Sequence, residues 1–435
     1  MSYDRSVSAG DHGLLSESVW TFQLPAVRFG AGAVDELGFQ LADLGVDEGA
    51  TGLLVTDETL IDVGHADRVA DALADQYTVD IYDDCEREPS VAAIEDCIAF
   101  VRDEQGPDGY DFYVGVGGGS VMDTAKATRA VVANGGAPLD YVAEPTGSGE
   151  ALTDSGAPLV CLPTTAGTGS EISPLAILSV PEKEIKEGIS SHHVRADAAV
   201  LDPTLTTTLP AAQTARTAMD ALGHAIEGYT THEFDSMLQA TEASERPVYA
   251  GRTPVTELFS KRAIELLSGN VRRAVHNGDD LEARSKMLQG ALFGAIAGLT
   301  AGANLAHAMA YPVGNRYHTY HGETIAVLTP ASTLGYNAAS DPDRYAEIAD
   351  LLGVNTARMS TREAADAAKA QYVQLQRDLN VLPSGLAELA GIDEDDLGWL
   401  AERTYESQQR LLRCNPRPVT ESDVYDIFED ALYNW

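Results

Sequence analysis

The sequence predicts an α/β domain built on a mostly parallel sheet, followed by an all-helical domain. Short apolar runs alternate with amphipathic stretches over the first 200 residues, as in parallel sheets whose strands are joined by helices. After Pro203, strand-like runs almost vanish and long segments of helical periodicity take over. The chain of 435 residues is long enough for two domains, each with a full core.

Six short apolar runs in the first half are predicted to be buried strands. They are bounded by glycine, proline or aspartate, and segments with helical periodicity such as 91–104 separate several of them. The predicted strands are 52–57, 78–83, 111–119, 157–165, 175–180 and 198–202.

The second half is predicted to contain long helices around an excursion loop at 230–254, which lacks periodicity. The segment 201–210 contains two prolines and four threonines, which favour a domain boundary there. We therefore predict domains at 1–202 and 203–435. The predicted helical segments are 213–229, 255–276, 280–310, 361–379 and 422–433.

Acidic residues outnumber basic residues by 67 to 29, which gives a net charge of −38. Only six of the basic residues are lysine. An acidic, lysine-poor surface suits concentrated salt, because salt screens its self-repulsion. We therefore predict a halophilic host. The same charge argues against nucleic acid or an anionic membrane as a partner, because both are polyanions.

The four cysteines show no metal-binding spacing, and we expect them to be free thiols in a reducing compartment. No apolar run approaches the roughly 18 residues of a membrane helix, and the N-terminus is polar. These features predict a cytoplasmic protein without a membrane segment.

A glycine-rich turn follows the predicted strand at 111–119. Gly117, Gly118 and Gly119 lead into Ser120, which opens a helix and has Asp123 at the spacing of a capping box. Glycines let backbone N–H groups approach a pyrophosphate, and the helix N-terminus adds a favourable dipole. The alternative is a tight turn that needs glycine for steric reasons alone.

A second polar loop, PTTAGTGSE at 163–171, follows the next predicted strand. Its hydroxyls, on Thr164, Thr165, Thr168 and Ser170, suit a ribose or diphosphate, although an irregular surface loop is the alternative. Two such loops at neighbouring strand ends together favour a nucleotide site. Asp57, at the end of the first strong strand, either accepts hydrogen bonds from a ribose and repels a 2′-phosphate, or simply caps a turn.

Asp220 and His224 are spaced i, i+4 in the helical segment MDALGHAIEGY, so both side chains project from one face. A carboxylate and an imidazole placed in this way can chelate one divalent metal. A hydrogen-bonded pair without a metal is the alternative.

Two further histidines lie in apolar surroundings rich in small residues. His307 is in a helix that we expect Pro312 to end, and His321 precedes a glycine and an apolar run. His318 competes with His321 but lacks the apolar flank. Each histidine alone is compatible with a core position. With Asp220 and His224, His307 and His321 form a plausible set of ligands for Fe²⁺ or Zn²⁺.

Five motifs occur in an order and spacing that resemble the iron-containing (group III) alcohol dehydrogenases. They are GGGSVMDTAKA, PTTAGTGSE, MDALGHAIEGY, LAHAMAYPVG and HGETIAVLTP. The resemblance extends from 28–38 to 415–435. The stretches 246–260 and 272–287 resemble the hydroxyacid-oxoacid transhydrogenase branch of this family.

This resemblance implies a dehydroquinate synthase-like architecture, in which 1–202 binds a dinucleotide, 203–435 binds a metal, and the active site lies in the cleft between them. The implied metal is Fe²⁺, with Zn²⁺ or Mn²⁺ as alternatives, and the implied cofactor is NAD rather than NADP. The implied metal ligands are Asp220, His224, His307 and His321. The implied cofactor contacts are Asp57, Gly118, Gly119, Ser120, Asp123, Thr164, Thr165, Thr168 and Lys186, the last near the nicotinamide ribose.

The implied activity is hydride transfer between a small alcohol or hydroxyacid and NAD, with the metal acting as a Lewis acid on the substrate hydroxyl. A hydroxyacid-oxoacid transhydrogenase would use the same residues. It would retain its cofactor between a donor like 4-hydroxybutyrate and an acceptor like 2-oxoglutarate. A related metal enzyme without a redox step, and a metal-free binding protein, fit the full motif set less well. We also expect a homodimer or a higher homo-oligomer.

Tyr311 marks a departure from many family members, which have histidine at its position in AHAMAYP. A phenol with a pKa of about 10 relays protons less well at neutral pH than an imidazole does. Tyr311 follows His307 by one helical turn, so we predict that it faces the site and hydrogen-bonds the substrate. A core tyrosine beside Pro312 is the alternative.

Overall fold

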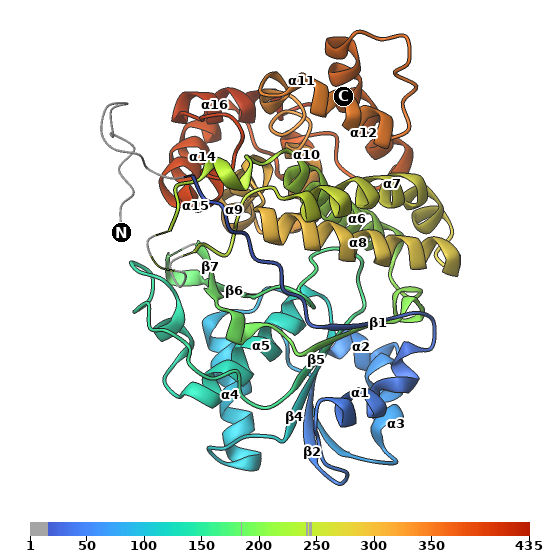
Figure 1. Cartoon of the computed structure of the whole chain (residues 1–435), viewed down its shortest axis with the longest axis vertical. Helices are drawn as coiled ribbons and strands as arrows, with labels where there is room; N and C mark the ends of the chain where they lie inside the picture. Colours follow the sequence, from blue (N-terminus) through green and yellow to red (C-terminus); the bar gives the residue numbers. More distant parts are fainter. Residues whose placement is uncertain (1–15, 184, 241, 243–245) are drawn as a thin grey trace.

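The computed structural model describes residues 16–183, 185–240, 242 and 246–435. The N-terminal half forms an α/β part and the rest forms a helical part, as the sequence predicts (Figure 1). The two parts stack along the long axis of the molecule (Figure 1). The antiparallel strands β6 (Leu175–Val180) and β7 (Ile185–Ser190) lie near the helices α9 (Leu305–Tyr317) and α15 (Gln409–Leu412).

Six parallel strands form one sheet in the order β1-β8-β5-β4-β2-β3. Because the strands are parallel, the loops that follow them emerge at one edge of the sheet. Five of these strands coincide with predicted runs, whereas β1 was not predicted. The strands are β1 (Ala26–Phe29), β2 (Thr51–Val55), β3 (Thr78–Tyr82), β4 (Phe112–Gly117), β5 (Leu159–Pro163) and β8 (Ala198–Leu201).

The predicted strand at 175–180 lies outside this sheet. It forms β6 (Leu175–Val180), which pairs antiparallel with β7 (Ile185–Ser190). Lys186, one of the predicted cofactor contacts, lies within β7. Because β7 has the mostly polar sequence IKEGIS, it lacks the apolar run by which the other strands were recognised.

Helices cover both faces of the sheet, because alternate residues of the central strands point to opposite sides. Val114 of β4 packs with Leu41 and Val69, whereas the adjacent Tyr113 packs with Met122 on the other face. The helices of this part are α1 (Leu37–Asp43), α2 (Glu58–Asp62), α3 (His65–Leu73), α4 (Val91–Gln105) and α5 (Gly119–Asn134).

The helical part is built around α6, which packs against α7, α8 and α10. Four of the five predicted helical segments are confirmed as single helices. The longer helices are α6 (Ala211–Thr230), α7 (Pro254–His276), α8 (Leu281–Ala301), α9 (Leu305–Tyr317), α12 (Thr361–Leu379) and α14 (Glu394–Ser407). The shorter ones are α10 (His321–Leu328), α11 (Pro342–Leu351), α13 (Leu386–Ala390), α15 (Gln409–Leu412) and α16 (Glu421–Asp430).

The fifth predicted segment, 280–310, is not one helix. It divides into α8 and α9, which meet at a bend of 98°. Gly302 ends α8 with φ of +114°, a value that favours glycine, and the side chain of Asn304 caps α9 by accepting from Leu305 N at 2.7 Å. The bend directs α9, which carries His307, toward α6.

The prediction that Pro312 ends its helix is also wrong. Pro312 is buried inside α9, which continues to Tyr317. Proline removes one backbone donor from a helix, but burial of neighbours such as Met309 and Val313 in a common core stabilises the turns on both sides.

Among the described residues, no single helix is long and apolar enough to cross a membrane; α8 and α9 reach that length and apolarity only as a bent pair. All four cysteines are free thiols, as predicted.

Candidate metal and cofactor site

Three helices bring together the four predicted metal ligands. Asp220 and His224 lie one turn apart on α6, His307 lies in the first turn of α9, and His321 begins α10. Asp220, His224 and His307 are buried, and each offers a ligand atom within 4.8 Å of those of the other two. The Nε2 atoms of His307 and His321 each lie 3.6 Å from Asp220 Oδ1.

The protonation of Asp220, His224 and His321 suits a cation, whereas His307 would have to lose a proton to bind one. Burial opposes ionisation of Asp220, but the imidazoles around it hold its pKa below the ordinary value. Burial lowers the pKa of His224 to about 4 and that of His321 to about 3, so both rings are neutral near pH 7 and have a lone pair to donate. Burial would also lower the pKa of His307, but the carboxylates of Glu227 and Asp220 raise it to about 9.

Glu227, which was not predicted from the sequence, contacts one of the predicted metal ligands. It is fully buried on α6, and its Oε2 lies 2.5 Å from Nδ1 of His307. Glu227 also accepts hydrogen bonds from the backbone N–H groups of Asn304 and Ala306 and from the hydroxyl of Thr333. By holding a proton on Nδ1, Glu227 turns Nε2 of His307 toward Asp220.

Unpartnered buried atoms provide a test of whether a metal fits this site. Asp220 Oδ1, His224 Nδ1 and His307 Nε2 are buried and have no hydrogen-bond partner among the described residues. Buried polar atoms are rarely left without partners, because this costs about 1–3 kcal/mol for each group. A divalent cation near Asp220 Oδ1 would satisfy this oxygen and a set of imidazole nitrogens, so the residues fit the implied metal.

His318, the competing candidate, lies outside this set. It is exposed, adopts a left-handed conformation at the end of α9, and directs its carbonyl toward the α/β part, where it accepts from Arg87 at 3.3 Å.

The two predicted cofactor loops lie against each other at the carboxyl edge of the sheet. They follow the adjacent strands β4 and β5. A Cβ added to Gly119 would lie 2.8 Å from the hydroxyl of Thr168, and one on Gly118 would lie 3.8 Å from Thr165. Glycine is therefore required at 119 for this close approach. The structure brings together Gly118, Gly119, Thr164, Thr165 and Thr168.

Asp123 lies beneath these loops and holds them in place. Its carboxylate accepts from the Ser170 hydroxyl at 2.6 Å and from Ile177 N at 3.1 Å, and pairs with Lys126 at 2.8 Å. Lys126, which the sequence analysis missed, is fully buried and also donates to the carbonyl of Ser170 and the hydroxyl of Ser173. Asp123 and Lys126 thus fix the shape of the second loop.

Asp57 and Ser120 both use their side chains within the protein. One oxygen of Asp57 accepts from Leu60 N at 3.0 Å and caps α2, as in the alternative interpretation of this residue. The Ser120 hydroxyl donates to the carbonyl of Arg87. Their cofactor contacts therefore stay a prediction, although both residues lie at the edge where the two loops meet.

Lys186 and Arg87 link the α/β part to the helices that carry the metal ligands. Lys186 pairs with Glu88 at 2.7 Å, and its Nζ would lie 3.9 Å from a Cβ on Gly314 of α9. The guanidinium of Arg87 lies 4.0 Å from the centroid of the Tyr320 ring, and Tyr320 precedes the predicted ligand His321. Arg216 of α6 lies over the same ring at 3.8 Å.

Tyr311 lies beside the ligand set, as predicted. Its ring centroid is 5.8 Å from that of His321, and burial raises the pKa of its phenol to about 12. No described residue accepts a hydrogen bond from its hydroxyl, which argues against the alternative of a core tyrosine bonded to a carbonyl.

The fold and the site together define a metal-dependent oxidoreductase that uses a nicotinamide dinucleotide. Residues 25–203 match the family described as iron-containing alcohol dehydrogenase, and residues 214–432 match its C-terminal domain. The chain belongs to this family.

Known relatives cover nearly the whole chain. A mitochondrial hydroxyacid-oxoacid transhydrogenase of Mus musculus is 32% identical over 99% of this chain and 94% of its own length. An NAD-dependent methanol dehydrogenase of Bacillus methanolicus is also 32% identical, over 94% of this chain and 98% of its own. A crystal structure of a 1,3-propanediol oxidoreductase has a TM-score of 0.84 and 32% identity, covering 95% of this chain and all of that one.

Proposed function

We propose that this enzyme oxidises hydroxyacids and that Asp220, His224, His307 and His321 hold its metal. The observation that carries the metal site is that Asp220, His224 and His307 offer ligand atoms within 4.8 Å of one another and that each has a buried polar atom without a hydrogen-bond partner among the described residues. The hydroxyacid class is supported by the transhydrogenase relative and by Tyr311, whose hydroxyl is available beside His321. Fe²⁺ is the metal that the family supports.

Glu227, the two cofactor loops and Tyr311 have separate roles in the proposed reaction. When bound, the metal supplies Lewis acidity toward the substrate hydroxyl and the nicotinamide accepts the hydride. Glu227 keeps a proton on His307 Nδ1, so Nε2 faces the metal position. The packed loops at Gly119 and Thr168 present backbone N–H groups and hydroxyls to the cofactor. Tyr311 donates a hydrogen bond to the substrate and stays neutral, because its pKa is raised to about 12.

Transhydrogenation with a retained cofactor is a second candidate, favoured by the contact between the two parts. Arg87 contacts both the Ser120 hydroxyl and, in the helical part, the Tyr320 ring and the His318 carbonyl. It would therefore hinder departure of a dinucleotide bound there.

The experiment that distinguishes the two candidates compares turnover of 4-hydroxybutyrate with free NAD against turnover of 4-hydroxybutyrate with 2-oxoglutarate and no added NAD. NADH release only in the first assay indicates a dehydrogenase, and 2-hydroxyglutarate formation in the second indicates a transhydrogenase. If metal-loaded protein forms neither NADH nor 2-hydroxyglutarate, the proposed substrate class is contradicted.

We predict a preference for NAD over NADP, because the Asp57 carboxylate would repel a 2′-phosphate. Asp57→Asn keeps an oxygen that can cap α2 and removes the charge. In this variant, kcat/KM with NAD divided by kcat/KM with NADP should therefore fall roughly tenfold, without loss of stability. Glu58→Gln, which removes the neighbouring charge, is the control. A wild type that uses both cofactors equally well would show that Asp57 does not select the cofactor.

Replacing Tyr311 by phenylalanine should lower kcat/KM for 4-hydroxybutyrate roughly tenfold or more, because one hydrogen bond to the substrate is lost while the ring still packs. Tyr311→His should shift preference toward plain alcohols. Steady-state kinetics of both variants with 4-hydroxybutyrate and 1-butanol measure these effects. If the ratio of kcat/KM for 4-hydroxybutyrate to kcat/KM for 1-butanol is the same in the variants as in the wild type, Tyr311 is a structural residue.

We also propose that the protein works in concentrated salt, as in the cytoplasm of a halophilic host, because its net charge is −38. Screening shortens the Debye length from about 8 Å at 0.15 M to about 3 Å at 1 M salt. Raising KCl from about 0.15 M to 3 M should therefore raise Tm by roughly 10 °C or more. Sucrose of equal osmolality is the control, and an unchanged Tm in KCl would refute the proposal.

A further inference from the structure

Arg410 lies near the ligand-bearing helix α9 and is used by neither the metal set nor the cofactor loops. It is in the short helix α15, and its side chain is exposed. The guanidinium carbon lies 5.0 Å from the centroid of the Tyr249 ring. No carboxylate among the described residues forms an ion pair with Arg410, in a chain with 67 acidic and 29 basic residues. Its charge is therefore available to an anion.

Packing fixes α15 against α9. Leu411, which follows Arg410, is buried in a cluster with Tyr249 and with Ala308, the neighbour of His307. Tyr311 packs against the same cluster. Helices α15 and α9 are in direct contact. Arg410 is thus held beside the helix that carries both His307 and Tyr311.

Tyr249 comes from the excursion at 230–254, which the sequence analysis left without a role. The N–H groups of Ala250 and Gly251 donate to the carbonyls of Thr300 and Ala301, at 2.9 and 3.0 Å, and so tie this segment to the end of α8. Tyr249 is only 9% exposed. Its ring therefore provides a fixed surface for the Arg410 guanidinium.

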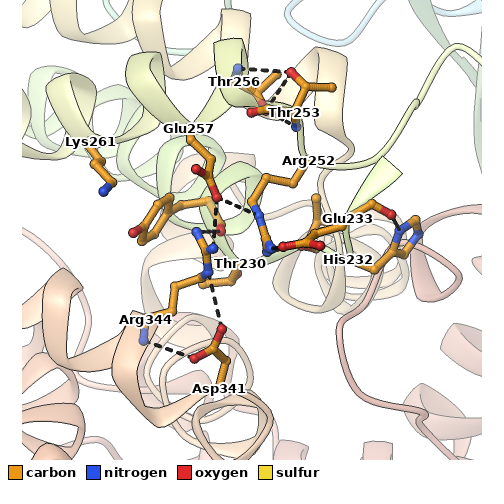
Figure 2. A network of polar contacts seen from close by, with 12 residues as sticks. Thr230, His232, Glu233, Arg252, Thr253, Thr256, Glu257, Lys261, Asp341 and Arg344 are labelled. Carbon is orange, nitrogen blue, oxygen red and sulfur yellow. Dashed lines mark hydrogen bonds and ion pairs between the residues drawn. The ribbon is translucent and has the colours of Figure 1, made fainter. Parts of the chain in front are cut away.

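A network of ion pairs holds the base of the same excursion (Figure 2). Arg252 pairs with Glu257 at 2.9 Å and with Glu233, and Arg344 pairs with Glu257 at 2.8 Å and with Asp341 at 3.5 Å. Arg252 also donates to the carbonyl of Thr231 at 2.9 Å. These contacts hold Arg252, three residues after Tyr249, against the helical part.

Tyr311 connects Arg410 with the metal ligands. Its ring centroid lies 5.8 Å from that of His321, and its side chain packs against the cluster that contains Tyr249, on whose ring Arg410 lies. A guanidinium and the phenol of Tyr311 therefore lie on one side of the ligand set. A guanidinium fork binds a carboxylate with two parallel hydrogen bonds, and a neutral phenol can donate a third.

We propose that Arg410, supported by Tyr249 and Tyr311, binds the carboxylate of the hydroxyacid substrate and so determines specificity. The inference rests on the proposed function and adds the residue that distinguishes a hydroxyacid from a plain alcohol. A plain alcohol would leave the guanidinium in water. A hydroxyacid places its carboxylate on Arg410 and its hydroxyl toward Asp220 and the histidines.

The test compares Arg410→Gln with Arg413→Gln, which removes an equal charge from an exposed arginine three residues further along the chain. The substrates are 4-hydroxybutyrate and 1-butanol, which have the same number of carbons and differ in the carboxylate, at constant KCl. Arg410→Gln should lower kcat/KM for 4-hydroxybutyrate roughly 10- to 100-fold and change that for 1-butanol by less than about twofold. Arg413→Gln should change neither.

Calorimetric titration with butyrate gives a readout that does not depend on turnover. The Kd of butyrate for the wild type and for Arg413→Gln should agree, and Arg410→Gln should raise it roughly tenfold or more. Equal losses on both substrates, or an unchanged Kd, would show that Arg410 only supports Tyr249 and would overturn the proposal. A wild type that oxidises 1-butanol but not 4-hydroxybutyrate would instead overturn the hydroxyacid function, and the inference with it.

Discussion

Replacing His307 by alanine is expected to remove the bound metal and abolish turnover while the fold is retained. Among the proposed ligands, His307 faces both Asp220, at 3.6 Å, and Glu227, at 2.5 Å. Without its ring, Glu227 loses a charged partner and Asp220 loses a nearby imidazole, so the remaining set attracts a divalent cation less specifically. Metal content per chain and kcat with 4-hydroxybutyrate measure the effect, and far-ultraviolet circular dichroism reports the fold.

His318→Asn is the matched control for this experiment. It replaces an exposed histidine in the same region by a residue that tolerates the left-handed conformation of position 318. We expect its metal content and kcat to match those of the wild type. A fully active His307→Ala protein would contradict the assignment of the ligand.

Replacing Glu227 by glutamine is expected to weaken metal binding roughly 10- to 100-fold, although Glu227 does not itself belong to the predicted ligand set. The carboxylate accepts from two backbone N–H groups, a hydroxyl and the imidazole of His307. Glutamine has one acceptor oxygen and presents an NH₂ group to these donors, so we also expect a loss of about 1–3 kcal/mol in the free energy of unfolding. Chelator competition measures the affinity, and thermal unfolding measures the stability.

Glu347→Gln is the control for Glu227→Gln. Glu347 accepts from the side chains of Tyr229 and Lys261 and contacts none of the predicted metal ligands. Its replacement should leave the metal affinity unchanged. If Glu227→Gln lowers stability but leaves metal affinity at the wild-type value, Glu227 supports the fold and does not orient His307.

Much of the fold could be predicted because its signals are local. Buried strands of a parallel sheet are continuous apolar runs, and five of its six strands were found in this way. The polar strand β7 gave no such signal. Pro312 was misjudged because core packing outweighs the local preference of proline. The bend at Gly302 had a readable signal, a glycine followed by an asparagine cap, but the periodicity on either side obscured it.

Only some residues of the candidate site could be predicted from local sequence patterns. The pair Asp220 and His224 follows from helical spacing alone, whereas His307 and His321 needed their apolar surroundings and the family resemblance. Glu227 lies three residues after His224 on the same helix, so its charge on a buried face was a visible signal. Its partner His307 is 80 residues away, and no local pattern reveals that contact. Arg410 has no motif, and only the packing of α15 on α9 brings it to the site.

The anomalous difference map of a crystal, measured at the absorption edge of the metal found in the purified protein, tests the central claim most directly. One peak per chain is expected, with the Asp220 carboxylate and imidazole nitrogens of His224, His307 and His321 at about 2.0–2.3 Å. A peak at other residues, or no peak from protein that turns over hydroxyacid, would contradict the account.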